Sequence, residues 1–124
     1  MSGIISGVID FNNKGISKEI KNSMIETINS YKVDNTNYIS KNNYLMVSGH
    51  LFITDENKRE VLPLYNEELG LTLVSDAILD NREELIEIFN KCEYKINNTI
   101  TDSELILMSY RKWEEDCPKY LLGD

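Results

Sequence analysis

The sequence predicts an α+β fold in which helices cover a β-sheet. The order of the patterns is one strand, one helix, several strands and then two helices, so strands and helices are segregated rather than alternating. The chain has 124 residues, 41% of them hydrophobic, which is enough for one packed domain over residues 1–124. Neither an internal repeat nor a linker interrupts it.

The expected strands are short apolar runs rich in β-branched residues. Their ranges are 3–9, 44–53, 61–65 and 71–75. Pro63 suits the edge or the end of a strand, because proline has no N–H to donate to a neighbouring strand. Residues 32–43 contain five Asn or Asp and are predicted to form a polar loop.

Three helices are predicted from capping residues and apolar spacing. The first spans 17–31, with Ser17 as N-cap. The second begins near Asp80 and Asn81. The third begins with Thr101-Asp102-Ser103-Glu104, which fits a capping box. Pro118 is expected to open a last short turn.

The composition bears on partners and location. The net charge of −8 disfavours binding to nucleic acid or to an anionic membrane surface. The start of the chain has neither a signal-peptide pattern nor a membrane span. Cys92 and Cys117 lack metal-ligand spacing, so we expect two reduced thiols, no metal site and a cytoplasmic location.

Three stretches together resemble class II glutamine amidotransferase domains, which stand at the front of asparagine synthetases. Met1-Ser2-Gly3-Ile4 resembles the opening Met-Cys-Gly-Ile of that family. Pro63-Leu64, followed by the segment 73–85, resembles its Pro-Leu and Asn-Gly-Glu-Ile-Tyr-Asn region. The segments 101–104, 113–116 and 122–124 resemble its Ser-Asp-x-Glu helix and the Trp-Gly and Leu-x-Gly stretch that follows it.

The resemblance implies an N-terminal-nucleophile (Ntn) hydrolase fold, a four-layer αββα sandwich that this chain would contain only in part. Residues 1–124 would then be its N-terminal portion, truncated at the C-terminal end, with further strands and a synthetase domain downstream. ATP and magnesium would belong to that synthetase domain, and no cofactor is expected within residues 1–124. Expected partners are the chain's own synthetase domain and a peptide or amino-acid substrate of the parent enzyme.

The same resemblance places the catalytic positions of a glutaminase. Ser2 stands where the family has its nucleophilic cysteine, and a hydroxyl is a weaker nucleophile than a thiol at neutral pH. Asp76 and Ala77 stand at the oxyanion-hole positions, where the family has asparagine and glycine. An ionised carboxylate has no hydrogen-bond donor, and losing one such donor typically costs about 10²–10³ in rate.

Substrate binding is altered as well. The family's arginine, which holds the glutamine carboxylate, has no counterpart, since no arginine precedes Arg59. Asp102 matches the acidic residue that grips the substrate amino group, but it also lies in the predicted capping box and could serve there instead. His50 is the single histidine, and its spacing identifies no serine or cysteine partner, so we expect a packing or surface role.

These departures favour a front domain without glutaminase activity. The segment 76–85 is closest to asparagine-synthetase-like cyclases of peptide natural products, such as the lasso-peptide type, in which the attacking amine belongs to the peptide. One alternative is an active Ntn amidohydrolase that uses Ser2 on another amide. The other is a stand-alone, non-enzymatic binding module.

Overall fold

A computed structural model describes residues 3–51 and 59–124 of the chain. It confirms the α+β class, with three α-helices and antiparallel strands. The chain divides into two compact units, Met1–Asp76 and Ala77–Asp124. The first unit holds the strands and one helix, and the second holds the remaining helices.

The first unit is built on a three-stranded antiparallel sheet in the order β1-β3-β2. β1 spans Gly3–Ile9, β3 spans Tyr44–His50 and β2 spans Asn35–Lys41. β2 corrects the prediction of a polar loop over 32–43. Its backbone pairs along the whole length of β3, and this pairing overrides the weak strand preference of its Asn and Ser residues.

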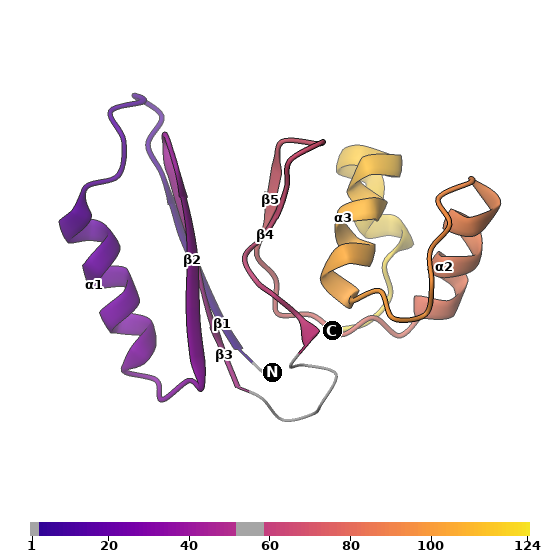
Figure 1. The fold of residues 1–124 in the computed structure, drawn as a ribbon, viewed down its shortest axis with the longest axis horizontal. Coiled ribbons are helices and arrows are strands. Elements are labelled where there is room, and N and C mark those ends of the chain that lie inside the picture. Colours follow the sequence, from indigo (N-terminus) through magenta and orange to yellow (C-terminus); the bar gives the residue numbers. More distant parts are fainter. Residues whose placement is uncertain (1–2, 52–58) are drawn as a thin grey trace. The chain divides into compact units, whose positions relative to one another are not determined.

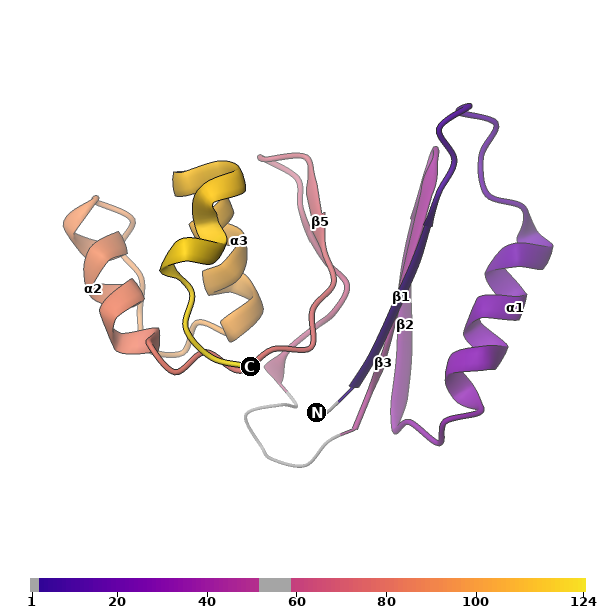
Figure 2. The same ribbon diagram turned by 180° about the vertical axis from the view of Figure 1, so that it is seen from behind.

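Helix α1, Lys18–Asn29, covers one face of this sheet (Figures 1 and 2). Ser17 caps it as predicted, accepting a hydrogen bond from the backbone N–H of Ile20 at 3.3 Å. Ile28 from α1 packs with Leu45 and Val47 of β3, and all three are buried. A side chain at Gly49 would collide with Ile28, so the helix lies close to the backbone of β3.

A small hairpin completes the first unit. β4, Leu64–Asn66, pairs with β5, Leu71–Leu73, so the two short strands predicted around the 66–70 turn are confirmed. The hydroxyls of Tyr44 and Thr72 lie 2.5 Å apart and join the hairpin to β3. Because side chains alternate along a strand, Tyr44 points to the sheet face opposite the one on which Leu45 packs against α1.

The second unit is helical. α2 spans Arg82–Lys91, α3 spans Asp102–Trp113, and a 3₁₀ helix, η2, spans Glu114–Tyr120. Its core is formed by buried residues of α2, α3 and the segment before them, namely Leu79, Leu85, Ile86, Phe89 and Leu105. The predicted capping box is present, since Thr101 and Glu104 each accept a hydrogen bond from the other's backbone N–H.

The last residues of the chain pair with the segment that leads into α2. Leu79 and Gly123 form an isolated antiparallel bridge. Ile78 and Asp124 exchange two backbone hydrogen bonds, at 2.9 and 3.1 Å. Throughout the described ranges, no helix combines the length and apolar character needed to cross a membrane.

Candidate functional site

The predicted nucleophile, Ser2, lies outside the described residues, but the next residue is clearly placed. Gly3 begins β1 and is paired with His50 of β3. A Cβ atom at position 3 would stand 2.8 Å from the carbonyl oxygen of Gly49, closer than packing permits. Only glycine therefore fits at this position without a shift of the backbone.

Asp76, the residue at the first oxyanion position, lies beside Gly3. Its Oδ1 and the Nδ1 of His50 are each 3.6 Å from the point where a Gly3 Cβ would stand. The Asp76 side chain is therefore directed toward the start of β1. An ionised carboxylate here can accept hydrogen bonds or balance a positive charge, but it cannot donate a hydrogen bond to an oxyanion.

His50 has a serine partner, which corrects the expectation from the sequence. Ser48 Oγ lies 2.5 Å from His50 Nε2. The two residues are neighbours on one face of β3, because side chains two apart on a strand point the same way. The two-residue spacing on a predicted strand is the sequence signal that indicates this pair.

The Ser48 hydroxyl sets the orientation of the His50 ring. Ser48 is fully buried, and within the described part of the chain His50 Nε2 is its hydrogen-bond partner. Which of the two atoms donates depends on the tautomer of His50, whose other ring nitrogen, Nδ1, lies on the side of Gly3 and Asp76. Because Ser48 has no exposed surface, it positions His50 rather than offering a nucleophile to a substrate.

The second oxyanion position, Ala77, follows Asp76 in a half-buried segment without regular structure. The structure thus brings Asp76 together with Gly3 and His50, while Asp102 belongs to a separate cluster in the second unit. Asp102 is the first residue of α3, but it does not cap the helix. Thr101 is the N-cap, which corrects the alternative role given to Asp102.

Both oxygens of the Asp102 carboxylate have partners. Oδ2 accepts a hydrogen bond from the backbone N–H of Leu79 at 3.0 Å. Oδ1 forms an ion pair with the guanidinium of Arg82. The same guanidinium donates to the carbonyl oxygen of Ile100 at 2.5 Å. Arg82 was not singled out from the sequence, since a separation of 20 residues carries no local signal.

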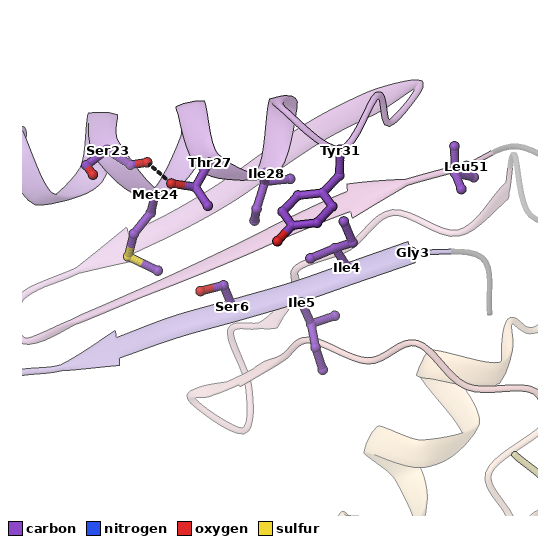
Figure 3. A pocket seen from close by; sticks show the side chains of 10 residues that line it. All are labelled: Gly3, Ile4, Ile5, Ser6, Ser23, Met24, Thr27, Ile28, Tyr31 and Leu51. Carbon is purple, nitrogen blue, oxygen red and sulfur yellow. Dashed lines mark hydrogen bonds between the residues drawn. The ribbon is translucent and has the colours of Figure 1, made fainter.

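An apolar groove of about 650 Å³ lies between α1 and β1, on the sheet face opposite His50 (Figure 3). Met24, Ile28 and Tyr31 project toward β1, where Ile4 points back at them. The lining residues within the described ranges are all uncharged, so none of them would hold an amino acid by its ammonium or carboxylate.

Comparison with known proteins identifies the family of the chain. The chain is 26% identical over 121 residues to "Asparagine synthetase [glutamine-hydrolyzing] 3" of Bacillus subtilis (strain 168), an alignment that covers 96% of this chain and 20% of that protein. The chain therefore spans about a fifth of the length of this relative. The family model of the glutamine amidotransferase domain matches residues 1–124. Since that match covers the whole sequence, the chain belongs to the glutamine amidotransferase domain family.

Proposed function

We propose that residues 1–124 are the front domain of an asparagine-synthetase-related, ATP-dependent amide-forming enzyme, and that this domain does not hydrolyse glutamine. The observation that carries the proposal is the carboxylate of Asp76, directed toward Gly3 at the start of β1. An oxyanion that formed there would meet a like charge instead of a donor, in a half-buried environment that weakens solvent screening.

Two further features support loss of the glutaminase reaction. Ser2 offers a hydroxyl where the family has a thiol. Asp102, which would grip the substrate amino group, is already paired with Arg82. Each change weakens a different step, namely nucleophilic attack, charge stabilisation and substrate binding, so restoring one of them alone should not restore the reaction.

The test is glutamate release from glutamine by the purified chain, after intact mass has shown whether Met1 is removed. We expect the wild-type chain and its Ser2→Ala variant to match the enzyme-free blank. We also expect Ser2→Cys to stay at the blank, because Asp76 and the missing arginine clamp remain. Glutamate release by the wild-type chain, abolished in Ser2→Ala, would establish the active amidohydrolase and overturn the proposal.

We extend the proposal to the parent protein by analogy with the family. Its remaining strands would complete an αββα sandwich, and its synthetase domain would bind ATP and magnesium and be the partner of residues 1–124. Its substrate would be a peptide or an amino acid, as in the peptide cyclases of lasso-peptide type, and it would act in the cytoplasm without binding nucleic acid or membrane. Reading the gene past codon 124 tests this: an ATP-pyrophosphatase segment of the Ser-Gly-Gly-x-Asp type is expected, and a stop codon directly after Asp124 would contradict it.

A further inference from the structure

We propose that the guanidinium of Arg82 takes the place of a substrate amino group on the carboxylate of Asp102. Arg82 would thereby prevent a ligand from binding to that carboxylate. The proposal rests on the proposed function in one respect, since the family resemblance assigns Asp102 to the amino group of a substrate. The closure itself rests on contacts within the second unit, where Arg82 supplies the charged N–H donor that a substrate ammonium would otherwise bring.

The contacts leave no unused oxygen on Asp102. Oδ2 accepts from the backbone N–H of Leu79, and Oδ1 accepts from the charged guanidinium of Arg82. The second guanidinium nitrogen is satisfied by the carbonyl oxygen of Ile100 at 2.5 Å. A carboxylate oxygen and a carbonyl oxygen thus converge on one cation, which is a suitable set of acceptors for an alkylammonium as well as for a guanidinium.

The position of Arg82 in its helix argues that the contact with Asp102, not helix stability, accounts for it. Arg82 is the first residue of α2, where the positive end of the helix dipole disfavours a cation. Asp102 is the first residue of α3, where a carboxylate is favoured. The side chains of Arg82 and Asp102 are 32% and 17% exposed, so the pair is partly shielded from solvent, and removing Arg82 would leave a partly buried carboxylate without its counterion.

The ligand class follows from this geometry. Truncating Arg82 to alanine should open a site that takes a small cation with N–H donors, such as guanidinium or an alkylammonium, including the α-ammonium of an amino acid. Tetramethylammonium carries the same charge but has no N–H, so it cannot satisfy Oδ1 of Asp102 and the carbonyl oxygen of Ile100. The wild-type chain should bind neither guanidinium, an alkylammonium nor tetramethylammonium at this site, because Arg82 already occupies it.

The experiment is thermal unfolding of the full chain in methylammonium, guanidinium or tetramethylammonium chloride at equal ionic strength. A ligand with a Kd of about 10 mM, present at about 100 mM, raises the folding equilibrium constant about tenfold. We expect this stabilisation of Arg82→Ala by methylammonium and guanidinium, but not by tetramethylammonium. We expect none in the wild-type chain or in the double variant Arg82→Ala/Asp102→Asn. If Arg82→Ala is unfolded, recovery of helical circular dichroism in the same titration replaces the melting curve.

Two outcomes would overturn the proposal. Stabilisation of Arg82→Ala by guanidinium alone would show that Arg82 has a purely structural role and that its site does not bind an amino group. Absence of any cation-specific effect, or an equal effect in the double variant, would show that Asp102 does not form the site. Neither outcome involves glutamate release, so failure here is distinguishable from failure of the proposed function.

Discussion

Individual side chains in this protein are positioned both by contacts within one strand or helix and by contacts between segments distant in sequence. Ser48 orients His50 within one strand, whereas Arg82 and Asp102 meet across 20 residues of chain. Each contact holds two side-chain groups in a fixed geometry. The chemical state of a group therefore depends on burial and partners that differ even between residues of the same type.

The two thiols illustrate this dependence and lead to a prediction. Cys92 is exposed, and Lys112 Nζ donates to its sulfur at 3.2 Å. Cys117 is buried, and this burial raises the pKa of its thiol. We expect N-ethylmaleimide to label Cys92 faster than Cys117 by about tenfold or more near neutral pH, because the reagent needs an accessible thiolate.

Intact mass over time measures these labelling rates. Cys92→Ser is the matched control, since only the slow label should remain in it, and that label should form faster as the pH rises toward the raised pKa of Cys117. Labelling of Cys117 in this control at the wild-type rate of Cys92 would contradict the predicted difference in exposure.

Site residues could be predicted from the sequence only in part. The resemblance pointed to Asp76 and Asp102, and the structure places them beside Gly3 and Arg82 respectively. The pairing of Arg82 with Asp102 could not be predicted, because it depends on how α2 packs against α3. The pairing of Ser48 with His50 is predictable from strand periodicity alone, because side chains two residues apart lie on the same face.

At the scale of elements, helices were predicted more accurately than strands. Ser17 and the Thr101 capping box mark helix starts through local hydrogen bonds that need no tertiary contact. β2 is polar, and its Asn-rich sequence resembles a loop until β3 provides a partner for its backbone. Strand formation at a sheet edge depends on that partner more than on side-chain preference, so composition gave the wrong answer there.

A prediction at this scale concerns the bridge between the end of the chain and the segment before α2. An alanine Cβ at Gly123 would stand 1.9 Å from the carbonyl oxygen of Ile78, and the φ of Gly123 is +146°. We expect Gly123→Ala to lower the free energy of unfolding by about 3 kcal/mol, the upper end for strained backbone, because the pairing must open to relieve the overlap.

Gly70→Ala is the matched control for this substitution. Gly70 also has a positive φ, +62°, but a Cβ there would meet nothing within 4 Å. Its replacement should cost about 1 kcal/mol from backbone strain alone. Chemical denaturation of both variants measures the difference. Equal losses in the free energy of unfolding would show that the close approach of Gly123 to Ile78 does not affect stability.

At the scale of the whole molecule, residues 3–51 and 59–124 form two hydrophobic cores that share no residue. One is centred on Leu45 and Val47 of the sheet, and the other on Phe89 and Leu105 of the helical unit. They correspond to the two compact units of the chain, Met1–Asp76 and Ala77–Asp124. Separate cores permit separate opening, because local unfolding follows cooperative units of packing rather than the covalent chain.

Hydrogen exchange on two core variants tests this organisation. Phe89 is fully buried, and Phe89→Ala should cost about 3–5 kcal/mol in its own core. We expect amide protection to fall in α3 and to persist in β3. Val47→Ala, the matched variant in the other core, should lower protection in β3 and spare α3. If either variant lowers protection equally in both elements, the cores unfold as one cooperative unit, and a change in either unit would then be felt at both Asp76 and Asp102.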